Sequence, residues 1–374
     1  MATLVVSDLH LGASSGADLL RRPELRAPLI AALRDGIRRL VILGDGLELR
    51  EVPVRNAAAH AEALLAEAGA ALGPGGEIVL LAGNHDHGLL AGWLETRLHQ
   101  GPHELGLEQA VEPAEAGPLA EALAAAAAPA ALRLSYPGIW LREDVYALHG
   151  HYLDVHTTVP TFERLAAGAM ERWVAPVRAH ATPDDYEAVL APLYAWMHAL
   201  AQRSADGVVR AGARSSARAW VAVAGEGRRR RPLRAAALGA GFKVAVRAIN
   251  AAGVGPVRPE LSGPALRQGS LHGIGEVVRR LDVGAAHVIF GHTHRSGPWP
   301  GDAAAEWEAP TGARLVNAGC WVYQPHFVAT AGSASPYWPG TAVRLDDDGS
   351  PPRLLRLLGD RRPEDLAPAR AARG

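Results

Sequence analysis

Short runs of apolar, often β-branched residues recur along the chain, and five of them end in a cluster of polar residues. Runs of this kind predict strands that are buried on both faces of a sheet. In such sheets, ligands and catalytic groups collect just beyond the carboxyl ends of the strands. The runs and their polar followers are residues 3–6 with Asp8 and His10, 40–43 with Asp45, 78–81 with Asn84, His85 and Asp86, 145–148 with His149 and His151, and 288–290 with His292 and His294.

Helical patterns fill the gaps between these runs. Apolar residues at helical spacing predict a helix over Pro23–Arg38, and Asn56 can cap a second helix that runs to about Leu72. The alternation of strands and helices predicts an α/β layered sheet. Three more strands are expected over residues 314–317, 341–345 and 353–358, with a hairpin turn at 347–349 between the last two.

The pattern changes between His156 and about Asp282. Helices are predicted over 161–174 and 183–203, and residues 203–247 then carry eleven basic residues against two acidic ones. We expect a largely helical, Arg-rich insertion or lid at 157–282 within a catalytic domain of residues 1–358, followed by a disordered tail at 359–374. The basic block has three interpretations: a membrane-surface lid with Trp220 and Phe242 interleaved among arginines, a grip on a polyanion, or a solvated loop.

Composition narrows the classes of protein. The chain has 374 residues, 48% of them hydrophobic and 21% charged, which is enough to bury a sizeable core. A net charge of −1 and few aromatic residues argue against nucleic acid as a partner. Cys320 is the only cysteine, so an internal disulfide and a thiolate metal site are excluded, and we expect a buried, unreactive thiol. We expect no targeting peptide and no membrane-spanning helix.

The five clusters together supply carboxylate, amide and imidazole donors and no thiol. This chemistry suits Mn²⁺, Fe or Zn²⁺ better than Mg²⁺ or Ca²⁺. One catalytic ion needs about three protein ligands, so the number of donors predicts two divalent ions that share a carboxylate. The donors are Asp8, His10, Asp45, Asn84, His149, His292 and His294.

These motifs, in this order, resemble the signature of the calcineurin-like metallophosphoesterase superfamily. The resemblance covers roughly residues 1–155 and 283–358, and it rests on Asp8-Leu9-His10, Gly44-Asp45, Gly83-Asn84-His85-Asp86, His149-Gly150-His151 and Gly291-His292-Thr293-His294. It implies a four-layer fold in which a two-sheet β-sandwich is flanked by helices.

The resemblance also assigns roles to the donors. One metal would take Asp8, His10 and His294, the other would take Asn84, His149 and His292, and Asp45 would bridge them. A hydroxide between the two ions would attack a phosphate ester or pyrophosphate. His85 would stabilise the transition state or protonate the leaving group, and Asp86 would orient His85.

The substrate is less defined than the chemistry. The opening Ser7-Asp8-Leu9-His10-Leu11-Gly12, the segment Gly291–Arg295 and the helical insertion resemble UDP-diacylglucosamine pyrophosphatase-type hydrolases. That subgroup usually has Arg in place of His85 and Asp in place of His151. We therefore expect a phosphorylated small molecule or lipid, with a general phosphodiesterase or phosphatase, or a non-catalytic binding module, as alternatives. The expected location is cytoplasmic, or peripheral on the inner face of a membrane; the oligomeric state is left open.

Several neighbouring residues have open roles. His151 could be a spare ligand, a substrate contact or a loop residue, and Glu48 could cap a local turn. His87 and Asp154 are expected to support the site or the fold. The segment 317–321 is expected to support the site, and the remaining histidines have no motif context.

Overall fold

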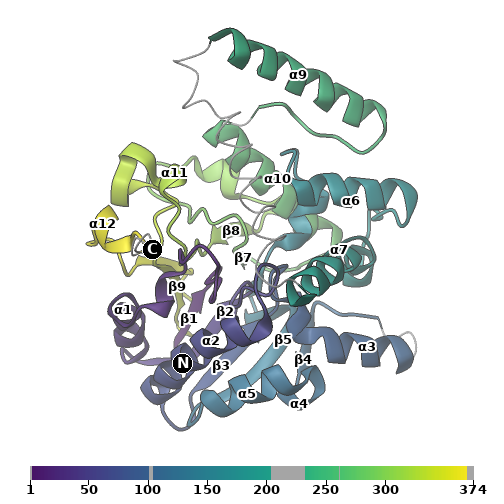
Figure 1. Ribbon diagram of the computed structural model, residues 1–374. Coiled ribbons are helices and arrows are strands. Elements are labelled where there is room, and N and C mark those ends of the chain that lie inside the picture. Colours follow the sequence, from purple (N-terminus) through teal and green to yellow (C-terminus); the bar gives the residue numbers. More distant parts are fainter. Residues whose placement is uncertain (1, 101–103, 204–231, 261, 369–374) are drawn as a thin grey trace.

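The structure, a computed structural model, describes residues 2–100, 104–203, 232–260 and 262–368. Ten strands form one sheet in the order β10-β9-β1-β2-β3-β5-β6-β7-β8, with β4 paired to β5 (Figure 1). The strands are β1 (Ala2–Val6), β2 (Ile37–Leu43), β3 (Glu77–Leu81), β4 (Glu108–Val111), β5 (Ala131–Arg142), β6 (Val145–Leu148), β7 (His287–Phe290), β8 (Arg314–Asn317), β9 (Thr341–Leu345) and β10 (Arg353–Arg356).

The long strand β5 belongs to both halves of the sheet. Its first part runs parallel to β3, and its second part, from Gly138 onward, runs antiparallel to β6. Pro137, which has no N–H to donate, lies where the pairing changes partner. The two predicted sheets are therefore two halves of one continuous sheet. The strand that joins them, β5, was not predicted from the sequence.

Alternate residues of the central strands face different cores. Val5, Val41 and Val79 pack against Ile139 and Ile289 in an apolar layer between the two halves of the sheet. Their chain neighbours face outward, because successive side chains of a strand point to opposite faces. The predicted α/β class, with two facing layers of strands between helices, is confirmed.

Each outer face of the sheet is covered by its own set of helices. The first half, around β1–β3, packs against α1 (Pro23–Leu33), α2 (Val54–Leu72) and α5 (Pro118–Ala126). The second half packs against α6 (Phe162–Trp173), α7 (Pro183–Arg203) and α10 (Gly263–Arg280). The other described helices are α3 (Ala91–Gln100), α4 (Pro113–Ala116), α9 (Pro232–Ala251), α11 (Pro325–Val328) and α12 (Pro363–Leu366), and the 3₁₀ turns are η1 (Leu19–Arg21), η2 (His87–Leu90), η3 (His151–Val155), η4 (Ala304–Trp307) and η5 (Ala329–Ala334).

Two expected helix boundaries are wrong. The first helix ends at Leu33 and not at Arg38, because Ile37 already pairs with Ala2 in the sheet. The second begins at Val54, after Pro53, so Asn56 lies inside it and does not cap it.

The expected disordered tail is also wrong for the described residues from 359 to 368. Pro363–Leu366 form α12, Leu366 is fully buried, and the Arg22 guanidinium donates hydrogen bonds to the carbonyls of Asp365, Leu366 and Ala367. The docked turn ties the end of the chain to the start of α1.

The described part of the segment between β6 and β7 is largely helical. The two strands are parallel neighbours in the sheet, and η3, α6, α7, α9 and α10 lie between them along the chain. Most of the Arg-rich block, including Trp220, falls at 204–231 and lies outside the described residues. Among the described helices, none is long and apolar enough to cross a membrane.

Candidate metal centre

The polar clusters meet at one edge of the sheet, where β1, β2, β3, β6 and β7 end. Backbone hydrogen bonds hold the loops together: Asp8 N–H donates to the Gly44 carbonyl, and His10 N–H donates to the Asp45 carbonyl, at 3.1 and 2.8 Å. Gly291 N–H donates to the His149 carbonyl at 2.9 Å, which joins the loops of the second half. The loops therefore form a fixed frame before any side chain is considered.

Five of the predicted donors have backbones in the left-handed region. The φ angles are 56° for Asp8, 46° for His10, 51° for Asp45, 67° for His292 and 59° for His294. Only one other non-glycine residue in the described part of the chain shares this feature, Asp282. Asp and His tolerate such angles better than most residues, and strained backbone of this kind gathers at functional sites. The turns aim these side chains at a common point.

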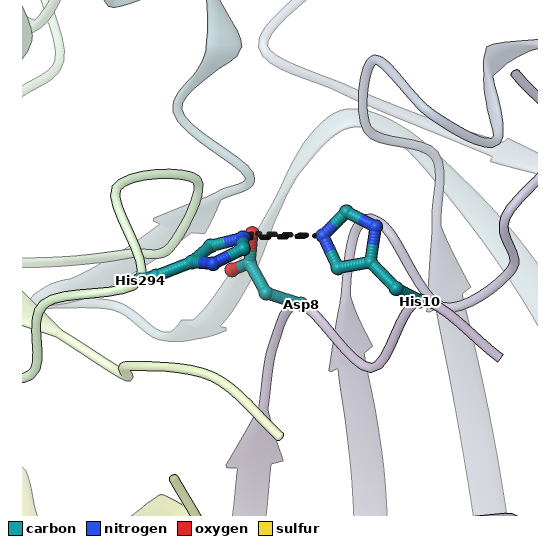
Figure 2. Close-up of side chains that lie close together, drawn as sticks. All are labelled: Asp8, His10 and His294. Atoms are coloured by element: carbon teal, nitrogen blue, oxygen red, sulfur yellow. Dashed lines mark hydrogen bonds and ion pairs between the residues drawn. The ribbon is translucent and has the colours of Figure 1, made fainter. Parts of the chain in front are cut away.

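Asp8, His10 and His294 form the first group that could hold a metal ion (Figure 2). The Nε2 atoms of the two imidazoles face each other at 3.1 Å, and Asp8 Oδ1 lies 3.3 Å from His294 Nε2. Asp8 Oδ1 is buried and has no hydrogen-bond partner among the described residues. Three donor atoms that point at one another, one of them unsatisfied, fit a shared cation.

Asp45, His149 and His292 form another such group. Asp45 Oδ2 lies 3.3 Å from His149 Nε2 and 3.7 Å from His10 Nε2, so this carboxylate stands between the two groups. A further group, His10, Asp45 and His85, overlaps both. The overlap places Asp45 where a carboxylate shared by two ions would lie.

Asn84 also reaches this cluster, through its amide. Its hydrogen bonds are satisfied when the amide nitrogen donates to His292 Nδ1 and Asp45 Oδ2, at 3.2 and 3.1 Å, and the oxygen accepts from Arg50 Nη1 at 2.5 Å. Those bonds need the amide turned over; in the structure the amide oxygen faces the cluster, with Oδ1 3.3 Å from His149 Nε2. The structure thus brings Asn84 to the predicted place with its oxygen on the side where a metal ligand would be needed.

Hydrogen bonds behind the rings fix which nitrogen faces the cluster. His10 Nδ1–H donates to Glu48 at 3.1 Å, His149 Nδ1–H donates to the Leu43 carbonyl at 2.9 Å, and His292 Nε2–H donates to Asp154 at 3.0 Å. Each ring therefore presents its other nitrogen toward the cluster. Metal-ligating histidines in proteins are held in this way, which is a second point of fit.

The charges of the cluster attract one another strongly. Burial opposes ionisation of every group here, but the attraction outweighs it. The His294 imidazole 3.3 Å away and the charge of His149 lower the pKa of Asp8 to about 2. Glu48 and Asp45 raise the pKa of His10 to about 9, and Asp45 raises the pKa of His149 to about 10. Buried carboxylates that hold protons on two imidazoles make a site that favours positive charge.

The predicted catalytic pair behaves differently from expectation. His85 lies at the rim of the cluster, with Nδ1–H donating to Glu48 at 2.7 Å. Asp86 does not orient His85, because both of its oxygens accept backbone N–H groups, from Gly83 and Gly46 at 2.7 Å and from Asp45 and Leu47 at 3.2 and 3.1 Å. The orienting role falls to Glu48, and Asp86 instead joins the β2 and β3 loops.

Glu48 combines two jobs. One oxygen accepts the backbone N–H groups of Arg50 and Glu51, at 3.0 and 3.1 Å, as the local turn cap that the sequence suggested. The other oxygen holds His10 and His85 together. The position of Glu48 three residues after Asp45 indicated the turn cap. It did not indicate that Glu48 holds the rings of His10 and His85.

The histidines with open roles lie beside the cluster. His87 donates to Glu187 of α7, a buried carboxylate that also accepts the hydroxyls of Tyr136 and Tyr152. Both ring nitrogens of His151 are buried without a hydrogen-bond partner among the described residues. His87 thus supports the contact between α7 and the sheet, and His151 stays unassigned.

The segment after β8 supports the site, as expected. Asn317 donates to the Gly291 carbonyl and to the Thr293 hydroxyl, at 3.1 and 2.9 Å. Trp321 N–H donates to the Asp8 carbonyl at 3.0 Å. These bonds brace the loops that carry Asp8 and His292.

No protein-family model matches the chain, and no curated protein matches it. Among solved structures, the chain is similar to a dimetal phosphatase from Danio rerio, with 13% identity and a TM-score of 0.34 over 96% of this chain and 99% of that chain. A likeness at this level supports no inference about activity, so the function is argued from the geometry of the site.

Proposed function

We propose that this protein is a hydrolase that uses two divalent metal ions to break a phosphate ester or pyrophosphate bond. The observation that carries the proposal is the set of overlapping carboxylate and imidazole groups that share His10 and Asp45 at one edge of the sheet. One ion would be held by Asp8, His10 and His294, the other by Asn84, His149 and His292, with Asp45 between them. Carboxylate and imidazole donors favour Mn²⁺, Fe or Zn²⁺.

Two such ions supply a hydroxide nucleophile near neutral pH and positive charge for the phosphoryl oxygens. The residues of the chain supply the rest. Glu48 accepts Nδ1–H of His85 and leaves the Nε2 atom of that ring toward solvent and substrate. His85, whose side chain is 22% exposed, can hold a proton at Nε2 for the departing oxygen. Asp86 keeps the loops that carry Asp45 and His85 in register.

The test compares variants at the shared carboxylate and at an imidazole. Asp45→Asn and His149→Ala should lose bound metal, measured by elemental analysis, and lose Mn²⁺-dependent hydrolysis of bis-p-nitrophenyl phosphate. Asp35→Asn is the matched control, because the side chain of Asp35 is 85% exposed and pairs only with Arg344 at the surface. Unchanged metal content in the Asp45 and His149 variants would contradict the site.

His85→Ala separates catalysis from metal binding. The variant should keep its metal and lose turnover, whereas loss of metal would make His85 a ligand. The different class of function, a binding module without catalysis, predicts that the wild-type protein binds metal and hydrolyses no member of a panel of nucleotide-lipid pyrophosphates, cyclic nucleotides, diesters and monoesters.

A substrate at a membrane surface is favoured by the exposed apolar residues. Apart from Leu98, the large hydrophobic residues exposed in the described part of the chain lie on or beside α6, α7 and α9: Phe162, Trp173, Val174, Trp196 and Val244. Trp and Phe on amphipathic helices bind the interfacial region of bilayers. In a flotation assay with liposomes that contain anionic lipid, the wild-type protein should float with the liposomes. The double variant Trp173→Ala/Trp196→Ala should not float, and the control variant Leu98→Ala should behave like wild type. Absence of wild-type binding at low salt would remove the membrane from the proposal.

A further inference from the structure

A cavity of about 260 Å³ adjoins the candidate metal centre on the side of His292. Its wall includes Asp154, His292 and Thr293, so one side of the cavity is the site itself. The rest of the wall comes from η3, α10, η4 and the segment around α11. The cavity therefore opens next to the atoms where a phosphoryl group would sit.

Most of the wall is apolar. Leu153 and Phe290 lie near the sheet, Leu266 and Leu271 come from α10, and Trp307 comes from η4. Hydroxyl groups contribute polar atoms at a few places, such as Thr157 and Ser270, but the Ser270 hydroxyl is already used in a bond to the Leu266 carbonyl. An apolar ligand group in this cavity would remove the apolar surface of the wall from water, which favours binding.

The charged side chains in the wall are paired. Arg267 binds Glu306 at 2.7 Å, and Arg295 binds Asp302 at 2.5 Å. Asp154 accepts the hydrogen bond from His292. Because each charge has its counter-charge within the protein, a charged ligand group would be desolvated here without a free partner, which is costly. The cavity therefore selects an uncharged group.

The volume limits the size of that group. An apolar cavity of about 150 Å³ in a protein interior is known to hold benzene. A volume of about 260 Å³ thus accommodates a single aromatic ring or a branched chain of similar bulk, and is small for a nucleoside with a second phosphate.

We infer that this cavity receives the ester substituent of the substrate, and that the substituent is an uncharged, mainly apolar group about the size of one aromatic ring. The inference rests on the proposed phosphoesterase function for the reacting phosphate. Recognition of the substituent itself needs no metal, so the two can be tested apart.

The binding test uses benzyl alcohol as an uncharged probe on metal-free protein, observed by ligand-detected NMR. The probe should bind wild-type protein. Binding should be lost in Ser270→Trp, which places an indole in the cavity. His272→Trp is the matched control, since His272 lies on the exposed face of the same helix. Tyr337→Ala, which removes part of the wall, should also weaken binding and guards against misfolding of the first variant.

The kinetic test uses two diesters with the same leaving group, phenyl p-nitrophenyl phosphate and methyl p-nitrophenyl phosphate. The phenyl ester should have a kcat/KM at least about tenfold higher, mainly through KM, because one extra methylene in an apolar pocket is already worth about that much. Ser270→Trp should abolish the preference for the phenyl ester, and His272→Trp should keep it.

The outcomes separate the two proposals. Probe binding without any hydrolysis would leave the cavity assignment standing and overturn the proposed function. Hydrolysis with equal kcat/KM for both esters, unaffected by Ser270→Trp, would overturn the cavity assignment alone. Absence of probe binding in wild-type protein would also overturn it.

Discussion

At the scale of single residues, the candidate centre depends on two carboxylates to which the sequence assigned only a turn cap, for Glu48, or general support, for Asp154. Glu48 fixes two rings, His10 and His85, and Asp154 fixes His292. Both carboxylates are almost fully buried, at 2% and 4% exposure. Their contribution is to choose a tautomer and an angle for each ring, which a motif search for ligands does not detect.

Glu48→Gln should therefore lower kcat by about 10- to 100-fold, as is typical when a group that orients a ligand is changed. The glutamine keeps an oxygen for one ring but loses the charge that holds both. We expect the KM for bis-p-nitrophenyl phosphate to change little and the affinity for Mn²⁺ to fall, measured by metal titration. Glu51→Gln is the control, because the Glu51 carboxylate accepts a hydrogen bond from the Ser14 hydroxyl and does not hold either ring. Equal behaviour of the two variants would contradict the orienting role.

The donors could be predicted from sequence because their spacing is local. Asp8 with His10, and His292 with His294, each lie two positions apart just after a buried strand. The role of Asp86 could not be predicted, because its partners are backbone N–H groups of two loops, and backbone groups leave no trace in the residue types.

At the scale of elements, the buried strands were predictable and the joining strand was not. Runs such as 40–43 are continuously apolar, which only a strand covered on both faces requires. β5 instead buries Ser135, whose hydroxyl donates to the Gly138 carbonyl, and contains Pro137. The stretch Ser135-Tyr136-Pro137-Gly138 looks like a turn in sequence. The residues at which β5 changes its pairing partner therefore concealed the strand.

The close fit between the strand-end loops makes Gly83 irreplaceable. A Cβ atom at this position would lie 2.3 Å from Asp45 Oδ1 and 2.6 Å from His149 Cδ2. Gly83→Ala should displace both side chains, lose bound metal and lower the free energy of unfolding by about 1–3 kcal/mol, as overpacking does. Urea denaturation and elemental analysis measure the two effects.

Gly284→Ala is the matched control for this variant. It lies in the loop before β7 and a Cβ atom there meets nothing within 4 Å. If Gly83→Ala retained its metal and the stability of this control, the tight packing of the loops would be refuted.

At the scale of the whole molecule, the sequence predicted the layered class and could not predict how the layers connect. Apolar runs say that strands are buried, but only the pairing of β5 with both β3 and β6 shows that the two layers are one sheet. The docking of α12 was likewise invisible, because it depends on Arg22, which is more than 340 positions away along the chain.

Cys320 offers a direct measure of global opening. Burial raises the pKa of its thiol to about 12, so almost no thiolate is present at pH 8 in the folded protein. Because it is the only cysteine, labelling by a disulfide reagent at pH 8 should be negligible in buffer and should follow unfolding in urea. Rapid labelling of native protein would show that the strand-end segment around residue 320 opens locally.

The first candidate group joins distant parts of the polypeptide: His10 and His294 face each other across 284 positions of sequence. In terms of synthesis, a growing chain that includes the loop after β3 already carries His10, Asp45 and His85, but the groups that need His292 and His294 wait for the loop after β7. Domains begin to fold while the chain is still being made. Capture of a full pair of ions would thus come only after β7 and the helices between β6 and β7 have been made.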